Sequence, residues 1–239
     1  MDAHVSCSAA MTDAWDDLAG WWIDAVRDDP SQSTDTHDVL AELLGGTDGP
    51  TVEVGCGEGQ GMRAVGGSVI GIDVSCELLR VARSAGPVVV GRAPDLSFIR
   101  SGVFRRVVAV GLLDLIDDHE AFLREAHRVA CPAAHLCVVI NHPIATAPAS
   151  APLVDPTGEV LWRWGTYLTP GVLPQRIDEH SVDLIHRPLG DLLTTAARAG
   201  WSLEKMIERG PSAATLARHP DMTGQEHIPT LAGFRWRRD

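Results

Sequence analysis

Short apolar runs alternate with amphipathic stretches along most of the chain after residue 50. Each run is apolar at consecutive positions, which is typical of a strand buried on both faces of a sheet. The stretches between the runs repeat apolar residues at helical spacing. The expected strands are Thr51–Val54, Val69–Ile72, Val88–Val90, Arg106–Val110 and Leu136–Ile140, and the expected helices are Gly61–Val65, Cys76–Ala85 and Glu120–Ala130. This alternation predicts a parallel α/β sheet.

The two ends of the chain carry a different pattern. Near the C-terminus, a helix over Asp191–Ala199 is expected to end at Gly200 and to precede two strands, Trp201–Ile207 and Thr230–Trp236. Residues 12–44 predict helices, because apolar residues recur there at helical spacing. The first of these helices places the following residues on one face: Trp15, Leu18, Ala19, Trp22 and Val26. We expect residues 1–46 to form a helical cap and residues 47–239 to form the α/β domain.

Residues 142–186 do not follow the alternation. They lack a clear period and contain six prolines: Pro143, Pro148, Pro152, Pro156, Pro170 and Pro174. A long irregular segment inside a compact domain is usually functional, often a lid or a substrate-binding insertion. Because it begins directly after an expected central strand, we predict that this insertion lies on the substrate side of the sheet.

Charge and hydrophobicity exclude several classes of partner. The 239 residues carry a formal net charge of −12, and residues 1–50 alone hold eleven acidic residues and one basic residue. This balance argues against a surface that binds nucleic acid phosphates. The longest apolar runs, such as Leu136–Ile140, are far shorter than the roughly 18 residues of a membrane span. We therefore expect neither a nucleic acid nor a membrane as partner.

The cysteines indicate a reducing compartment. They are scattered without CxxC spacing: Cys7, Cys56, Cys76, Cys131 and Cys137. An odd, unpatterned set fits reduced thiols better than a disulfide framework or a zinc site, so no bound metal is expected. The first residues show no basic and apolar stretch of the kind that forms a secretory signal. We expect a cytoplasmic protein.

A glycine-rich loop carries the strongest functional signal. The stretch Val52–Gly61 reads Val-Glu-Val-Gly-Cys-Gly-Glu-Gly-Gln-Gly, and it follows a strand and leads into a helix. Its backbone amides can therefore face a ligand at the carboxyl edge of the sheet. A dinucleotide fingerprint would need glycine at position 60, where the chain has Gln60. The acid Glu53, two residues before Gly55, suits an ammonium group rather than a pyrophosphate.

This loop resembles motif I of the class I S-adenosylmethionine (SAM)-dependent methyltransferases, and four segments resemble the motifs that follow it in order. Residues 69–75 resemble the second strand, which ends in an acid for the ribose hydroxyls, and residues 91–98 resemble the segment along the adenine. Residues 104–119 resemble the fourth strand with its loop, and residues 128–136 the approach to the fifth strand. The methyltransferase 11-like branch, which acts on small molecules, is the nearest one. The resemblance is good over residues 50–141 and looser over 186–236.

The resemblance implies a Rossmann-like, seven-stranded, mostly parallel sheet whose last strand is antiparallel. It also implies SAM as cofactor and S-adenosylhomocysteine as product. The implied cofactor-binding residues are Glu53, Gly55, Cys56, Gly57, Gly59, Asp73, Val74, Ala93, Pro94 and Leu112. Asp73 could instead cap the following helix. Among the departures from the family pattern, Arg92 and Arg105 stand where acids are usual.

The acceptor side is predicted from aromatic and titratable residues. The candidate substrate-binding residues are Trp15, Trp22, Trp162, Trp164 and Arg187, and the candidates for proton transfer are His142, His186 and Tyr167. The tryptophans of the first helix could equally pack on the core, and each histidine could be a surface or capping residue. An aromatic-walled cavity with an acidic rim would favour a flat aromatic acceptor, especially one with an amine.

The sequence thus predicts methyl transfer from SAM to a small-molecule acceptor, of the kind found in specialised metabolism. Two alternatives belong to other classes. A SAM-binding scaffold or regulator without catalysis stays open because of Arg92 and Arg105. A nicotinamide oxidoreductase is disfavoured by Gln60. The sequence leaves open which acceptor atom is methylated and how many copies of the chain assemble.

Overall fold

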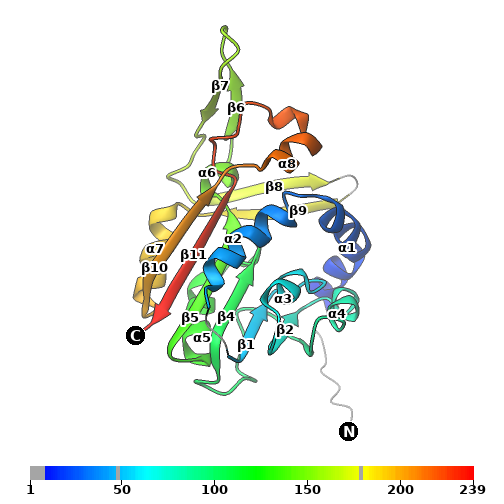
Figure 1. The fold of residues 1–239 in the computed structure, drawn as a ribbon, viewed down its shortest axis with the longest axis vertical. Helices are drawn as coiled ribbons and strands as arrows, with labels where there is room; N and C mark the ends of the chain where they lie inside the picture. Colours follow the sequence, from blue (N-terminus) through cyan, green and yellow to red (C-terminus); the bar gives the residue numbers. More distant parts are fainter. Residues whose placement is uncertain (1–8, 47–48, 178–179) are drawn as a thin grey trace.

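A seven-stranded sheet forms the centre of the computed structural model, which describes residues 9–46, 49–177 and 180–239. The strand order is β10-β11-β5-β4-β1-β2-β3 (Figure 1). The strands are β1 Thr51–Val54, β2 Val69–Asp73, β3 Val88–Val90, β4 Phe104–Val110, β5 Ala130–Asn141, β10 Trp201–Arg209 and β11 Leu231–Arg238. The five strands β1 to β5 pair in parallel, and β11 is antiparallel to both of its neighbours. The predicted α/β fold with a mostly parallel sheet is confirmed.

Helices cover both faces of this sheet. On one face lies α2, Thr34–Leu44, which packs on β5, β10 and β11 and on the short helix α3, Gln60–Val65. On the other face lie α5, His119–Val129, and α7, Leu189–Arg198. The helix α4, Cys76–Ala82, contacts β2 and β3, and α1, Ala9–Asp28, contacts α4. The helices predicted within residues 12–44 are thus α1 and α2.

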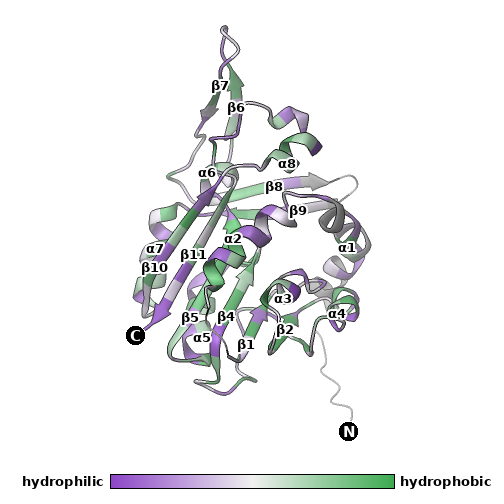
Figure 2. Cartoon of the chain, viewed as in Figure 1, coloured by the Kyte–Doolittle hydropathy of each residue, from purple (hydrophilic) through white to green (hydrophobic). Residues whose placement is uncertain are grey.

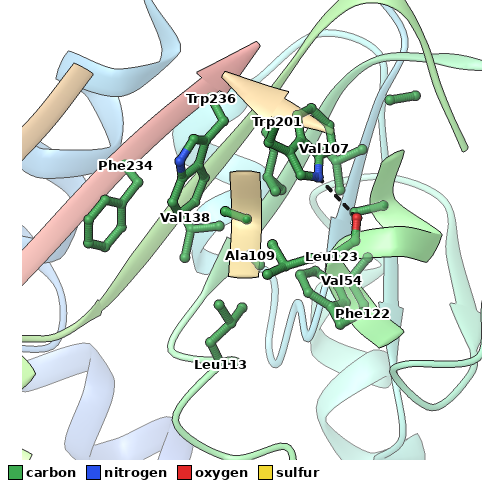
Figure 3. Close-up of a cluster of buried hydrophobic side chains, with 14 of the residues drawn as sticks. Val54, Val107, Ala109, Leu113, Phe122, Leu123, Val138, Trp201, Phe234 and Trp236 are labelled. Carbon is green, nitrogen blue, oxygen red and sulfur yellow. Dashed lines mark hydrogen bonds between the residues drawn. The ribbon is translucent and has the colours of Figure 1, made fainter. Parts of the chain in front are cut away.

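The core explains why the central strands are apolar at consecutive positions. All four residues of β1 are buried, and the largest cluster joins the sheet to α5 and α7. In that cluster the indole Nε1 of Trp201 donates to the carbonyl of Leu123 at 3.0 Å (Figure 3). The middle strands are mostly hydrophobic, whereas the end of β11 is hydrophilic (Figure 2). Burial on both faces therefore accounts for the runs of consecutive apolar residues from which the sheet was predicted.

Side-chain caps set the beginnings of two helices near the carboxyl edge of the sheet. The hydroxyl of Ser75 accepts from the amide of Leu78 at the start of α4. The carboxylate of Asp118 accepts from the amide of Ala121 at 2.8 Å at the start of α5. Ser75, rather than Asp73, is therefore the N-cap of α4, and Asp73 is left for another role.

The insertion over residues 142–186 is not irregular, so that expectation is wrong. It contains α6 Pro143–Thr146, β6 Ala151–Val154, β7 Val160–Arg163, β8 Gly171–Ile177 and β9 His180–His186. The strands form two separate two-stranded antiparallel sheets, and the β6–β7 hairpin projects from the body (Figure 1). Every strand of a two-stranded sheet is an edge strand, which tolerates proline. Pro152 in β6 and Pro174 in β8 therefore made these strands hard to predict from the sequence, although proline is compatible with both.

Two further elements were not predicted. The helix α8, Ala213–Arg218, and a short 3-10 helix, Pro220–Met222, lie between β10 and β11. Across the described part of the chain, no helix has both the length and the apolar character that crossing a membrane requires. Cys7 lies outside the described residues.

Candidate functional site

The glycine loop lies where β1 ends and α3 begins. Gly55, Gly57 and Gly59 have φ angles of +73°, +52° and +88°, a region that residues with a side chain rarely adopt. The amide of Gly55 donates to the carbonyl of Ile72 at 2.8 Å, which ties the loop to β2. A Cβ at Gly55 would lie 2.9 Å from Cδ1 of Leu112. The shape of the loop therefore requires glycine.

Asp73, the last residue of β2, faces this loop. Its Oδ2 accepts from the amide of Gly57 at 2.8 Å, and its Oδ1 accepts from the amide of Ser75 at 2.9 Å. Burial raises the pKa of Asp73, while these backbone donors act in the opposite direction. Each carboxylate oxygen has two acceptor sites. The carboxylate is therefore held in place and can still accept hydrogen bonds from a pair of ligand hydroxyls.

Glu53 is the most unusual carboxyl of the site. It is 1% exposed, and its Oε2 has no hydrogen-bond partner within the described part of the chain. Burial, with the nearby charge of Asp73 as a further cause, raises the pKa of Glu53 to about 8. A Cβ at Gly61 would collide with Glu53 Oε1, so a glycine makes room for this carboxyl. A buried acceptor without a partner is costly unless a ligand satisfies it.

Two cavities meet at the glycine loop. The larger has a volume of about 360 Å³, and its lining includes seven of the ten predicted cofactor residues: Gly55, Gly57, Asp73, Val74, Ala93, Pro94 and Leu112. The smaller has a volume of about 90 Å³ and includes Glu53 and Cys56. The two cavities share Trp22, Gly55, Gly57, Val110 and Gly111. Gly59 lines neither; a Cβ there would lie 2.9 Å from the backbone of Ala82 in α4.

The helix α1 forms part of the wall of the larger cavity. Trp15 and Trp22, both predicted to bind the acceptor, line this cavity, and their rings meet edge to face at 5.9 Å. Asp16 on the same helix accepts from the hydroxyl of Ser75 and, at 3.1 Å, from the amide of Glu77. The carboxylate thereby lies at the N-terminus of α4, where the helix dipole favours a negative charge. These hydrogen bonds join α1 to the start of α4, close to Asp73.

The two candidate histidines are engaged within the protein. His142 caps α6 by accepting from the amide of Ile144, and its Nε2 lies 2.9 Å from Glu208 Oε1. His186 is fully buried, with Nδ1 at 3.1 Å from the Thr146 hydroxyl and Nε2 at 2.8 Å from a backbone carbonyl. Neither histidine lines the two cavities. Their hydrogen bonds favour a structural role for both histidines over the proton-transfer role that the sequence also allowed.

The other acceptor-side candidates of the insertion also lie away from the lining of the two cavities. Trp164 is 58% exposed, and its ring contacts Tyr167 edge to face at 5.2 Å. The hydroxyl of Tyr167 accepts from the amide of Leu189. Trp162 donates from Nε1 to the carbonyl of Ile144 at 3.3 Å. Of these contacts, the one between Tyr167 and Leu189 joins the insertion to α7, and the other two lie within the insertion.

Arg187 holds the loop that follows β4. Its guanidinium donates to the carbonyls of Leu113, Ile116 and Asp117 at 2.7, 2.5 and 2.9 Å. Ile116 and Asp117 line the larger cavity. Arg187 therefore acts on the site through the shape of this loop, with its charge directed at backbone carbonyls.

Several lining residues were not predicted from the sequence. In the larger cavity they include Leu78, Arg92, Leu115, Ile116, Asp117 and Asp118, and in the smaller cavity Gln32, Thr36, Glu58, Gln60 and Asn141. Asn141 could have been found, because it directly follows an expected central strand and ligands bind at the carboxyl ends of such strands. Gln32 and Thr36 lie on or just before α2, which no motif connects with the glycine loop.

The residues present fit SAM. The buried, unpartnered oxygen of Glu53 suits the ammonium group of the cofactor, and the Asp73 carboxylate suits two ribose hydroxyls. The larger cavity is lined by Ala93 and Pro94, from the segment predicted to lie along the adenine, and by Leu112. These assignments of individual residues remain predictions.

Comparisons with known proteins agree with this fit. Residues 52–138 match the family model Methyltransf_11, described as a methyltransferase domain. No curated protein matches the chain. The chain is similar to the structure of a SAM-dependent methyltransferase from Mesorhizobium loti, with 26% identity and a TM-score of 0.69, over 89% of this chain and 100% of that one.

Two further structures share the fold. A candidate SAM-dependent methyltransferase from Listeria monocytogenes has 20% identity and a TM-score of 0.72, over 87% of this chain and 100% of that one. The glycopeptide N-methyltransferase MtfA, crystallised with S-adenosylhomocysteine and also with SAM, has 14% identity and a TM-score of 0.59 in the first complex, over 88% of this chain and 90% of that one. The domain match over residues 52–138 and the structure from Mesorhizobium loti support a SAM-dependent methyltransferase, and the two structures of lower identity show that the fold is shared.

Proposed function

We propose that this protein transfers the methyl group of SAM to a small-molecule acceptor that enters the smaller cavity. The observation that carries the proposal is the position of this cavity. It borders Glu53 and the glycine loop on one side and the ends of β4 and β5 on the other. An acceptor there would lie next to the methionine end of the cofactor, as the reaction requires.

The protein's contribution to this reaction is alignment. The sulfonium of SAM supplies an activated methyl group with a good leaving group. Glu53 would hold the amino group of the cofactor and Asp73 its ribose, while the walls of the smaller cavity orient the acceptor in line with the methyl group. Holding two reactants in an attack geometry can lower the barrier by on the order of 7–11 kcal/mol. The helix α1 excludes water from the reacting atoms.

The lining of the smaller cavity supports an acceptor that donates hydrogen bonds. Apart from Glu53, which the proposal assigns to the cofactor, it contains one carboxyl and three side-chain amides: Glu58, Gln32, Gln60 and Asn141. Trp22 adds one aromatic wall. The aromatic acceptor predicted from the sequence therefore rests on Trp22, because Trp162 and Trp164 line neither cavity. The same lining favours an amine, since acids and amide oxygens accept from N–H groups.

The second candidate function is a SAM-binding protein without catalysis. The volume of about 90 Å³ favours it, because a cavity of this size has little room for an acceptor beside the cofactor. Under the catalytic proposal, α1 must move to admit the acceptor, as lids do in many enzymes. The two functions therefore differ in whether any acceptor is turned over.

A transfer assay with radiolabelled SAM separates them. The purified protein is incubated with a panel of aromatic amines, aliphatic amines and phenols, and labelled products are counted. Methylation of at least one compound, lost in Asp73→Ala, supports the proposal. Tight SAM binding by calorimetry without transfer to any compound of the panel would favour the scaffold, and the absence of SAM binding would overturn both.

A further inference from the structure

Asn141, the last residue of β5, reaches the smaller cavity from the carboxyl edge of the sheet. Both of its nitrogen donors are engaged by one carboxylate. The backbone N and the side-chain Nδ2 each donate to the same oxygen, Oδ2 of Asp114, at 3.0 Å. Asn141 is also the only asparagine in the chain.

The carboxylate of Asp114 determines which way the amide of Asn141 faces. An ionised carboxylate only accepts hydrogen bonds, so the Nδ2 end of the amide must face it. The amide oxygen Oδ1 is then directed elsewhere. Within the described residues, no hydrogen bond is made to this oxygen. The amide of Asn141, a residue that lines the cavity, is therefore held with Nδ2 on Asp114, which leaves Oδ1 without a donor among the described residues.

The position of Asp114 is itself fixed by neighbours on other elements. Asp114 is buried, and its carbonyl accepts from the amide of Ile185 in β9 at 2.7 Å. The adjoining residues Leu113 and Ile116 are held by the guanidinium of Arg187. The pair Asp114–Asn141 thus rests on a braced loop, which limits rotation of the amide.

We propose that Oδ1 of Asn141 accepts a hydrogen bond from the N–H of the atom to be methylated, and that Asp114 is its positioning residue. The acceptor is then a neutral primary or secondary amine. This inference rests on the function proposed above and narrows its substrate class. A tertiary amine or a thiolate has no such proton and leaves Oδ1 unsatisfied.

The hydrogen bond also directs the lone pair of the amine. With its N–H on Oδ1, the nitrogen uses its lone pair to form the bond to the methyl carbon. The carbon–sulfur bond breaks and its electron pair remains on the sulfur, which gives S-adenosylhomocysteine. The nitrogen, now positively charged, loses its proton to water. No protein base is needed for an amine that enters in the neutral form.

Sinefungin tests this without knowledge of the acceptor. It resembles SAM but carries an amino group in place of the transferable methyl group, so its N–H groups reach toward the acceptor position. We expect the protein to bind sinefungin about tenfold more tightly than S-adenosylhomocysteine, as one charge-assisted hydrogen bond supplies. Calorimetry measures both dissociation constants for each variant.

In Asn141→Ala, the preference for sinefungin should fall about tenfold while the affinity for S-adenosylhomocysteine changes less than twofold. Asp114→Asn should reduce the preference as well, because an amide at position 114 lets Asn141 turn either way. Gln225→Ala is the matched control: it removes another buried amide, whose Nε2 donates to the carbonyl of Asp221, and should lower stability without changing the preference.

Asn141→Ser replaces Asn141→Ala if the latter does not fold. An unchanged preference in the Asn141 variant overturns the inference, and so does equal affinity of the unaltered protein for the two ligands. Both outcomes leave the proposed function standing, because S-adenosylhomocysteine is still bound. Failure of the unaltered protein to bind S-adenosylhomocysteine contradicts the proposed function itself.

Discussion

The amide of Gly57 donates a hydrogen bond to Oδ2 of Asp73 at 2.8 Å, across 16 residues of sequence. The bond joins the glycine loop after β1 to the acid at the end of β2. The bond fixes the relative position of the loop and the carboxylate. A site organised in this way spends less binding free energy on ordering its own groups.

The first prediction concerns Asp73. Replacing it by alanine removes both the acceptor for the ribose hydroxyls and the partner of the Gly57 amide. We expect Asp73→Ala to weaken SAM binding by roughly ten- to a hundredfold, the size of one or two hydrogen bonds to a charged group. Calorimetry on the folded variant measures this. Unchanged affinity would refute the role of Asp73. The SAM affinity of Asp73→Asn should lie between those of the unaltered protein and Asp73→Ala.

The second prediction separates backbone strain from ligand contact. Gly57 and Gly66 both have positive φ, of +52° and +63°, but only Gly57 lines the cavities. Gly57→Ala and Gly66→Ala should each destabilise the fold by about 1–2 kcal/mol, the cost of a left-handed residue with a side chain. Only Gly57→Ala should also lose SAM affinity. Equal SAM affinity in the two variants would show that the loop does not approach the cofactor.

Sequence patterns predicted the sheet and seven of the residues that line the larger cavity. The central strands are buried on both faces, so their residues are apolar at consecutive positions, and this pattern is visible in the sequence. Glu53 is the last residue but one of β1, and Asp73 is the last residue of β2. The strands around Pro152 and Pro174 escaped prediction because proline is allowed at edges. The partners of His142 and His186 come from distant elements, so no local pattern could show that their ring nitrogens are engaged. Asn141 was not predicted as a site residue because a single amide forms no motif.

The third prediction follows from the pKa of Glu53. In the unfolded chain this group loses its proton near its ordinary value of 4.5, and in the folded protein near about 8. Between these values the folded state binds more protons, so this group lowers stability as the pH rises. Compared with the unaltered protein, Glu53→Gln should gain relative stability from pH 5 to pH 8, on the order of a few kcal/mol.

Denaturant unfolding of both proteins at pH 5 and pH 8 measures this difference. Asp73 is present in both, so its own titration largely cancels. The same variant should bind SAM about tenfold more weakly, because an amide cannot pair with the ammonium group as a carboxylate does. A stability difference that is constant with pH would mean that Glu53 is ionised in the folded protein throughout this range.

The fourth prediction tests the docking of α1. Asp16 accepts from Ser75 and Glu77 at the N-terminus of α4, whereas Asp24 on the same helix is exposed. Asp16→Ala should cost about 0.5–2 kcal/mol, as the loss of a capping acceptor does. If α1 is the lid, SAM should also dissociate faster from this variant, which stopped-flow tryptophan fluorescence can follow. Asp24→Ala is the matched control, and identical dissociation rates in the two variants would argue against a lid.

The fifth prediction, the position of the cofactor itself, is tested most directly by a crystal structure of the complex with S-adenosylhomocysteine. We expect the ribose hydroxyls within hydrogen-bond distance of Asp73 and the amino group within that distance of the buried oxygen of Glu53. The homocysteine end should border the smaller cavity beside Asn141. A ligand bound elsewhere, or one whose amino group leaves Glu53 unpaired, would contradict the account of this site.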